Sequence, residues 1–519
     1  MESEQTPITL DVGPVTPGQV VAVARGGAGV TLSEAALEAI DAGRRTIDGL
    51  AEDSRPHYGV STGFGALANR HIPHERRDQL QRSLIRSHAA GAGQEVEREV
   101  VRAMMTLRLS TMATGHTGVR RETALAYAGL LSAGLTPVVC EFGSLGCSGD
   151  LAPLAHCALA VMGEGEVRDA RGTLLPAGRA LAGAGIAPVQ LAEKEGLALI
   201  NGTDGMLGML LLALEDLRVL LTTADITAAL SVEGLLGTDA VFAEDLHRLR
   251  PHPGQAASAA NMRAMLAGSP IVASHRGPED PRVQDAYSLR CAPAVAGGAR
   301  DTVAHAAAVA ERELASIIDN PVIAGAGDEV RVASNGNFHG APVGYVLDFL
   351  AVVAADVASI AERRTDRFLD PARSHGLAAF LADDPGVDSG LMIAQYTQAA
   401  IVSELKRLAV PASVDSIPSS AMQEDHVSMG WSAARKLRRA VDGLARVLAV
   451  ELVTATRGVE LRAPLAPGPA TGAVVATLRT RVGGPGPDRF VAPDLEAAYE
   501  LVRGGEVVAA AEAVTGPLA

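Results

Sequence analysis

The stretch DGMLGMLLLALEDLRVLLTTADITAALSVEGLL, residues 204–236, decides the fold class. Its apolar run is interrupted by charge only from Glu215 onward, Thr203 precedes it as an N-cap residue, and Asp204 places a negative charge in the first turn. We therefore expect one long buried helix over these residues. Helices beyond about 25 residues are typical of helical bundles rather than of ordinary α/β sheets.

Other segments carry the same helical periodicity. After Ser33, an N-cap residue, the apolar residues Leu37, Ile40 and Ile47 fall on one helix face. Strand signals are few and are confined to Ile8–Val12 and Glu329–Val332. Further helices are predicted over 299–317, 343–363, 395–409 and 428–458. The chain is thus expected to be mainly α-helical.

The order of these segments predicts three regions. A smaller N-terminal mixed region over 1–200 precedes a central long-helix bundle over 201–462, and a helical tail over 463–519 follows. Pro/Gly-rich breaks at 464–472 and 483–487 mark loops near the C-terminal end.

Composition excludes several classes of protein. Among the 519 residues, 45 are basic and 60 are acidic, which gives a net charge of −15 and leaves no basic patch for a nucleic acid. Charged residues interrupt the apolar stretches before they reach the roughly 18 uncharged residues of a membrane span. The polar start MESEQTPITLDVG does not resemble a signal peptide. We expect a soluble protein.

The cysteines indicate a reducing compartment. Four cysteines in so long a chain make neither a disulfide framework nor a metal-binding spacing. A cytoplasmic location is the simplest interpretation. The four are Cys140, Cys147, Cys157 and Cys291.

The chemistry is concentrated in GSLGCSGDLAPLAH, residues 143–156. A nucleophile elbow needs Gly two positions after the serine, where this chain has Asp150. A phosphate loop needs a following Gly-Lys-Ser/Thr, which is missing. A plain turn is the commonest role of an isolated Ser-Gly-Asp.

A third interpretation has a physical mechanism. If the amide nitrogen of Gly149 attacks the carbonyl carbon of Cys147, the backbone closes into a five-membered ring. Loss of water there, and of the Ser148 hydroxyl as a second water, leaves a conjugated methylidene-imidazolone (MIO). Glycine is required at the attacking position because a Cβ would hinder the close approach. Cys147 contributes only its carbonyl, so Ala or Thr would also serve.

At these residues the chain resembles the aromatic amino acid ammonia-lyase family, whose usual pattern is Ala-Ser-Gly-Asp. The resemblance covers most of the chain in the expected order. Besides the Ser-Gly-Asp segment, the matching motifs are HYGVSTGFG (57–65), LIRSHAAGAG (84–93), LALINGTDG (197–205), VQDAYSLRC (283–291), DNPVI (319–323), SNGNFHG (334–340) and VDSIPSSAMQEDHVSMG (414–430).

The resemblance implies a role for several residues. Tyr58 would be the base that takes the β-proton, and a phenol needs surroundings that lower its pKa to do this. Asn201 would bind the ring and the substrate amino group. Arg290 would hold the substrate carboxylate with its planar guanidinium. Gln284 and the catalytic Tyr287 would help to hold the substrate or the ring.

The specificity residues favour histidine-acting members of the family. Glu424 stands where members acting on phenylalanine or tyrosine commonly carry an amide, and a carboxylate can accept the N–H of an imidazole. Facing a phenyl ring, the buried charge would be unpaired at a cost of several kcal/mol. Ser87-His88 also matches the histidine branch. Phe338 would lie against the ring and the substrate, and Met422 departs from the common Asn.

The same resemblance implies the assembly and the cofactor. The fold would be the ammonia-lyase/fumarase-like helical bundle, with the MIO loop in the N-terminal region and four subunits sharing active sites. Arg290 and Tyr287 would then come from a different chain than Ser148. No diffusible cofactor and no metal is expected, because the consecutive residues Glu424, Asp425 and His426 would point in different directions on a helix.

The expected reaction is deamination of L-histidine to trans-urocanate and ammonia, the first step of histidine degradation. Two alternatives stay open within the family, a tyrosine or phenylalanine ammonia-lyase and a 2,3-aminomutase. A third, from another class, is a non-catalytic helical homologue whose loop never cyclises.

Overall fold

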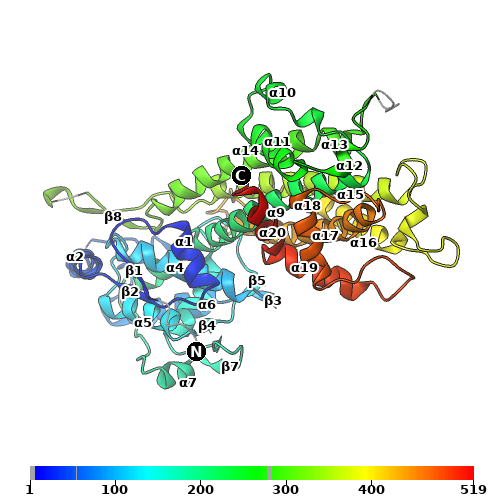
Figure 1. Ribbon diagram of the computed structural model, residues 1–519. Coiled ribbons are helices and arrows are strands. Elements are labelled where there is room, and N and C mark those ends of the chain that lie inside the picture. The colour runs from blue at the N-terminus through cyan, green and yellow to red at the C-terminus, as the bar shows by residue number, and fades with distance from the viewer. Residues whose placement is uncertain (1–5, 54, 278–282, 326) are drawn as a thin grey trace. The chain divides into compact units, whose positions relative to one another are not determined.

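The structure, a computed structural model, describes residues 6–53, 55–277, 283–325 and 327–519 (Figure 1). The chain forms two compact units, each assembled from separate stretches of sequence. Unit 1 comprises Met1–Leu212, Ala307–Leu347 and Pro411–Arg435, and unit 2 comprises Ala213–Ala306, Asp348–Val410 and Lys436–Ala519. The division into 1–200, 201–462 and 463–519 remains a prediction.

Unit 1 contains the short strands together with many of the shorter helices. Its strands are β1 (Ile8–Leu10), β2 (Val30–Leu32), β3 (Ala92–Glu95), β4 (Thr136–Pro137), β5 (Cys140–Phe142), β6 (Glu166–Arg168), β7 (Leu174–Pro176), β8 (Val322–Ala324) and β9 (Arg331–Ala333). Its helices are α1 (Pro17–Ala24), α2 (Glu34–Ala51), α3 (Arg77–His88), α4 (Arg98–Ala113), α5 (Arg121–Ser132), α6 (Leu151–Val161), α7 (Ala177–Gly183) and α8 (Glu195–Ile200), with 3-10 turns η1 (Gly65–Leu67), η2 (His74–Arg76) and η4 (Gly327–Glu329).

The strands pair only in small groups. β1 pairs with β2 in parallel, whereas β3 with β5, β4 with β6 and β7, and β8 with β9 are antiparallel. Sheets this small supply no layer of their own, so helix packing makes the core. Short strands and helices thus occur together in the N-terminal part of the chain, where a smaller mixed region was predicted.

Among the described residues of unit 2, the named elements are all helices, joined by turns and loops. Its elements are η3 (Ala240–Phe242), α10 (Glu244–Arg248), α11 (Pro253–Leu266), α12 (Pro270–Ala273), α13 (Tyr287–Arg290), η5 (Ala379–Leu381), α16 (Met392–Leu408), α18 (Pro469–Arg479), α19 (Ala492–Arg503) and α20 (Glu506–Thr515).

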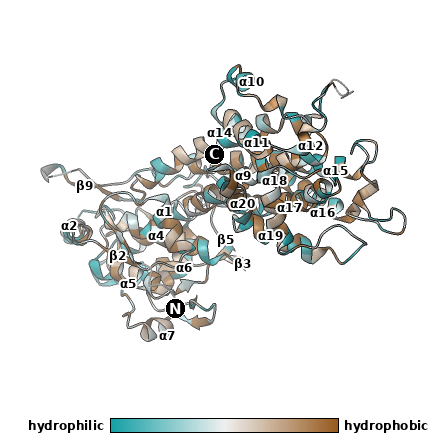
Figure 2. Ribbon diagram, viewed as in Figure 1, coloured by the Kyte–Doolittle hydropathy of each residue, from teal (hydrophilic) through white to brown (hydrophobic). Residues whose placement is uncertain are grey.

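Four long helices contribute residues to both units. They are α9 (Asp204–Gly234), α14 (Ala292–Leu314), α15 (Ala341–Leu369) and α17 (Gly430–Glu460). The helix predicted over 204–236 is confirmed as α9, and most of its apolar side chains are buried. Figure 2 colours the ribbon by the hydropathy of each residue. The helices predicted over 299–317, 343–363, 395–409 and 428–458 are confirmed as α14, α15, α16 and α17, with shifted ends. The mainly helical fold class is therefore confirmed.

A local cap determines the start of α2, whereas tertiary contacts determine the start of α9. Ser33 caps α2 as predicted, because its hydroxyl accepts the Ala36 amide at 3.0 Å. At the start of α9, by contrast, the Thr203 hydroxyl donates to Glu313 at 2.6 Å. The first-turn amides of α9 instead bind a carboxylate from elsewhere in unit 1, which is described below.

Two helical stretches, Glu195–Gly234 and Ala341–Leu369, are long and apolar enough to cross a membrane by length and composition. Their most apolar windows are 94% and 61% buried inside the protein. Core helices pass the same test, so this property agrees with a helix-packed interior.

Candidate active site

The loop that carries Cys147, Ser148 and Gly149 connects β5 to α6 in unit 1. Backbone and side-chain contacts hold its first half. The Gly146 carbonyl accepts the Ser428 hydroxyl at 2.8 Å and the Gly340 amide at 3.3 Å. The Met429 amide donates to the Leu145 carbonyl at 2.9 Å. Segments far apart in the sequence thus fix the loop.

Gly149 is required by its position. Its φ is +79°, a left-handed conformation that side chains disfavour, and a Cβ there would lie 2.2 Å from the Gly202 carbonyl oxygen. The adjacent Asp150 amide donates to that same oxygen at 2.7 Å. Only glycine fits at position 149, and a glycine without a Cβ is also what ring closure onto Cys147 requires, so residues 147–149 fit the MIO group.

Asp150 anchors the loop to the start of α9. Its Oδ2 accepts the amides of Gly205 and Met206 at 2.9 Å each, and its Oδ1 accepts the Ser144 hydroxyl at 2.9 Å. Complete burial raises the pKa of Asp150 to about 7, against the opposing effect of these hydrogen bonds. Sequence reasoning gave Asp150 no role, although it belongs to the Ser-Gly-Asp motif.

Glu424 lies directly against the loop. Its Oε2 accepts the Cys147 thiol at 3.0 Å and the Ser419 hydroxyl at 3.0 Å, and its Oε1 accepts the Ser148 hydroxyl at 3.2 Å. Met422, two residues before Glu424, is exposed and has a positive φ of 68°. The structure thus brings Glu424 to the residues predicted to form the electrophile.

The environment of Cys147 keeps its thiol protonated. Burial and the neighbouring Glu424 carboxylate raise the pKa of Cys147 to about 12. The thiolate is the reactive form of cysteine, so almost none of it exists near neutral pH.

Tyr58 does not have the surroundings predicted from the sequence. Burial raises the pKa of its phenol, and the nearby charge of Glu424 raises it further. One contact acts the other way, because the Gly65 amide donates to the phenolic oxygen at 3.2 Å. The expectation of a lowered pKa is therefore wrong for this chain, because desolvation outweighs the hydrogen bond.

His88 ends α3 and is oriented by its own helix. Its Nδ1 lies 2.9 Å from the Leu84 carbonyl and 3.1 Å from the Ser87 hydroxyl. A carbonyl only accepts, so Nδ1 carries the proton and Nε2 is left as an acceptor. Burial lowers the pKa of His88, although the Glu424 charge opposes this. His88 is thus favoured as a neutral imidazole.

Asn201 and Phe338 also belong to unit 1. Asn201 is the C-cap residue of α8, and its Nδ2 donates to the Asn320 carbonyl at 3.2 Å. Phe338 is half-buried in the segment between β9 and α15. Its neighbour His339 stacks on His426 with ring centroids 5.6 Å apart.

The remaining predicted residues lie in unit 2. Arg290 ends α13, donates to Gln284 Oε1 at 2.8 Å and has its guanidinium 4.7 Å from the centre of the Tyr287 ring. Tyr287 is 71% exposed. These three residues form one cluster within unit 2.

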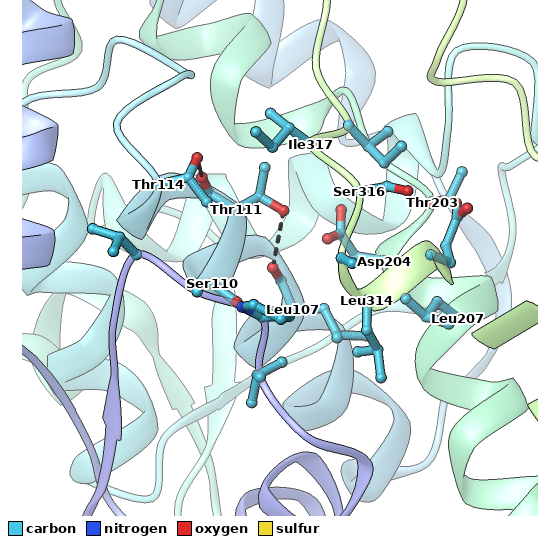
Figure 3. A pocket seen from close by; sticks show the side chains of 17 residues that line it. Leu107, Ser110, Thr111, Thr114, Thr203, Asp204, Leu207, Leu314, Ser316 and Ile317 are labelled. Atoms are coloured by element: carbon cyan, nitrogen blue, oxygen red, sulfur yellow. Dashed lines mark hydrogen bonds between the residues drawn. The ribbon is translucent and has the colours of Figure 1, made fainter. Parts of the chain in front are cut away.

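A small pocket lies beside the start of α9 in unit 1, with a volume of about 90 Å³ (Figure 3). Thr203, Asp204 and Glu313 give it a polar wall, and Leu107 and Leu314 give it apolar surface. Burial raises the pKa of Asp204 and of Glu313. None of the residues predicted for catalysis lines this pocket.

Within the described part of the chain, no group of three or more His, Cys, Asp or Glu residues is arranged to hold a metal ion. The absence of a metal requirement stays a prediction.

Known proteins resemble this chain over almost its whole length. Residues 15–480 match the family described as aromatic amino acid lyase. The histidine ammonia-lyase of Streptomyces griseus is 68% identical over 515 residues, covering 99% of each chain. That of Streptomyces avermitilis is 66% identical over 513 residues, again covering 99% of each.

Solved structures share the fold. A tyrosine aminomutase from Streptomyces globisporus has a TM-score of 0.93 at 35% identity and covers 99% of this chain and 100% of its own. A histidine ammonia-lyase from Trypanosoma cruzi has a TM-score of 0.89 at 36% identity, covering 98% of this chain and 96% of its own.

Proposed function

The chain belongs to the aromatic amino acid lyase family, and from this premise we propose that it removes ammonia from L-histidine to give trans-urocanate. It is a carbon–nitrogen lyase. The observation that carries the choice of substrate is the carboxylate of Glu424, which lies against Cys147 and Ser148 at 3.0 and 3.2 Å.

A carboxylate at this position suits an imidazole ring. An imidazole N–H can donate to it, whereas a phenyl ring would leave the desolvated charge unpaired. The Ser148 hydroxyl that now occupies Glu424 Oε1 is the group that ring closure expels as water. Its loss would free Oε1 to accept the substrate.

Residues 147–149 would form the prosthetic group, and Asp150 and Gly202 would keep their backbone in the required conformation. The resulting methylidene-imidazolone supplies an electrophile that no unmodified side chain offers. Asn201 would bind the substrate amino group, and Phe338 would pack against the substrate. We propose no diffusible cofactor and no metal.

Tyr58 is the proposed base for the β-proton. Because burial raises its pKa, the phenolate must be generated within the assembled site, and the Gly65 amide is the contact in this chain that favours it. Neutral His88 would face the imidazole of the substrate. Arg290, with Gln284 and Tyr287, would bind the substrate carboxylate through a two-pronged ion pair.

We propose a homotetramer with shared active sites. The support in this chain is an apolar stripe on α15, where Tyr345, Phe349 and Val352 follow helical spacing and are each 45–49% exposed. A contiguous exposed apolar face is typical of an interface between subunits. We propose a soluble cytoplasmic enzyme, in keeping with the acidic composition and the free cysteines.

Product analysis tests the substrate. The purified protein is incubated separately with L-histidine, L-tyrosine and L-phenylalanine, and the products are separated and identified. Urocanate should form from histidine, with little or no cinnamate or coumarate from the other two. A β-amino acid as the main product would instead identify an aminomutase, an activity named for the S. globisporus structure.

Intact mass tests the prosthetic group independently. The mature chain should be lighter than its sequence by two water molecules. A full-mass chain without activity would identify the non-catalytic homologue.

A further inference from the structure

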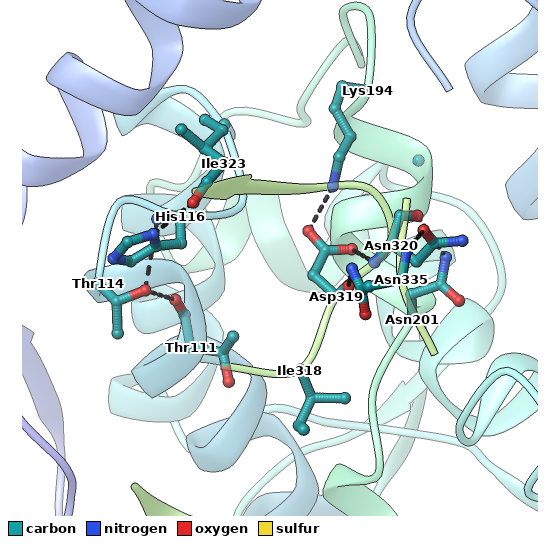
Figure 4. Close-up of polar contacts among 12 residues, drawn as sticks. Thr111, Thr114, His116, Lys194, Asn201, Ile318, Asp319, Asn320, Ile323 and Asn335 are labelled. Carbon is teal, nitrogen blue, oxygen red and sulfur yellow. Dashed lines mark hydrogen bonds and ion pairs between the residues drawn. The ribbon is translucent and has the colours of Figure 1, made fainter. Parts of the chain in front are cut away.

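A fully buried pair of opposite charges, Lys194 and Asp319, lies near Asn201, the asparagine proposed to bind the substrate amino group (Figure 4). The Lys194 ammonium contacts the Asp319 carboxylate, and neither side chain is exposed to solvent. Removing two charges from water costs about as much as their attraction returns, so such a pair is weak evidence for stability alone. Its connections indicate another role.

The first connection runs from Asp319 to Asn201. Asp319 Oδ1 accepts the Asn320 amide at 2.7 Å, and the Asn320 carbonyl accepts the Asn201 side-chain amide at 3.2 Å. Asn335 supports the same turn, since its Nδ2 donates to the Asp319 carbonyl at 3.0 Å. The carbonyl that holds the Asn201 side chain is therefore fixed by Asp319.

The second connection runs from Lys194 to Asn201 through α8. Lys194 is the N-cap residue of this six-residue helix, with a positive φ of 74°, and Asn201 is its C-cap residue. The ion pair thus holds one end of α8 to the same turn that binds the side chain at the other end.

A separate cation fixes the backbone of Asn201. The buried Arg108 guanidinium donates to the Asn201 carbonyl at 2.6 Å and to the Ile318 carbonyl at 2.7 Å. The backbone and the side chain of Asn201 are therefore both tied to residues 318–320. An amide group is planar, so one fixed N–H also sets the direction of its carbonyl oxygen.

We propose that Lys194 and Asp319 are positioning residues, which hold the Asn201 amide through Asn320 in the orientation that ammonia release requires. The inference rests on the proposed function. A merely structural pair would support folding and leave the turnover of the folded enzyme unchanged.

The test replaces both charges together, because removing one would leave the other buried and unpaired. The variant Lys194→Met/Asp319→Asn should lower kcat for histidine by about 10-fold to 100-fold, the scale of a small misplacement of a catalytic group. KM should change by less than about 3-fold. Intact mass should still be two waters short, because the ring forms on another loop. Arg300→Met/Asp225→Asn, which removes a buried pair within unit 2, is the matched control and should lower Tm without this fall in kcat.

The decisive measurement repeats the double replacement in an Asn201→Ala background. If the pair acts through Asn201, it should change the remaining kcat by less than about 2-fold, because residues that act as a unit are not additive. Should the double variant not fold, Lys194→Gln/Asp319→Asn, which keeps a hydrogen-bonding group at each position and leaves no charge unpaired, is carried through the same cycle.

Three results would overturn the inference. Unchanged kcat in the otherwise intact enzyme would do so, as would an equal fall in both backgrounds. If the parent enzyme forms its ring but releases no urocanate from histidine, the proposed function fails and the inference with it. An active parent with additive variants refutes the role of the pair alone.

Discussion

The two parts of the proposed machinery differ in how the chain holds them. The loop 143–150 is mostly buried, and contacts with Ser428, Gly202 and the start of α9 hold it in place. The segment 283–290 in unit 2 is more exposed by comparison, with Val283 94% and Tyr287 71% exposed. Within this segment, Arg290 hydrogen-bonds to Gln284 and lies over the ring of Tyr287.

The difference separates two tasks. A loop that must bring a backbone nitrogen onto a carbonyl carbon needs a rigid frame, and one folded unit supplies it. A guanidinium that binds a carboxylate is strong only where water is excluded. A half-buried guanidinium beside the exposed Tyr287 therefore suits a carboxylate clamp that another subunit would cover on assembly, as we propose for Arg290.

The largest effect is expected from a substitution in the rigid loop 143–150. Ser148→Ala removes the hydroxyl that must leave as water, so the ring cannot be completed. We expect the rate of urocanate formation to fall by roughly 1,000-fold or more, the scale of deleting an essential catalytic group. Intact mass should no longer be two waters short, while the melting temperature stays close to that of the parent. Near-normal activity would contradict the assignment of the electrophile.

The next-largest effect tests whether the carboxylate clamp and the ring-forming loop work independently. Arg290→Lys keeps the charge but loses the planar, two-pronged geometry, so kcat/KM for histidine should fall by about 10-fold to 100-fold. Ring formation, followed by intact mass, should be unaffected because it belongs to unit 1. A variant that loses both activity and the ring would show that the two halves are not independent.

Glu424→Gln tests whether the carboxylate of Glu424 determines the choice of histidine as substrate. The amide keeps one acceptor but loses the charge, and hydrogen bonds to charged groups are worth about 1.5–3 kcal/mol. Turnover of histidine should fall by about 10-fold or more, and the ratio of phenylalanine to histidine turnover should rise. Both are measured as initial rates beside the melting temperature. Parent-like kinetics would refute the imidazole argument.

Asp150→Asn tests the anchor of the loop through pH. Because the pKa of Asp150 is raised from 3.8 to about 7, the folded state binds its proton more tightly than the unfolded state does. Its stabilising contribution is present below about pH 4 and is lost as pH rises through 7. Between pH 4.5 and 8, the parent should lose up to roughly 3 kcal/mol relative to the variant, measured by urea unfolding. Parallel pH profiles would contradict the raised pKa.

The smallest effect concerns the departure from the usual Ala-Ser-Gly pattern. Cys147→Ala should change kcat by less than about 3-fold, because only the carbonyl of this residue enters the ring. With its pKa raised to about 12, the thiol should react negligibly with iodoacetamide at pH 8. Inactivation of the parent by this reagent, with the Cys147→Ala variant resistant, would refute that expectation.

Local sequence determined the helices, because their signals are short-range. The apolar run of 204–236 and the Ser33 cap need only neighbours within a few turns, and both predictions are confirmed. The motif of residues 147–149 determined the chemistry to expect, since the ring uses three adjacent residues and a glycine without a Cβ. The structure gives a further reason for glycine at position 149, because a Cβ there would clash with the Gly202 carbonyl oxygen.

Tertiary structure decided what depends on distant partners. No local pattern could show that Asp150 caps α9, that Glu424 lies against Ser148, or that Lys194 meets Asp319, because each pair joins residues 50 or more positions apart. The same reason explains the wrong expectation for Tyr58, whose pKa follows from burial that its own loop does not encode. Sequence fixes which groups are present, whereas burial and long-range contact decide their charge and orientation.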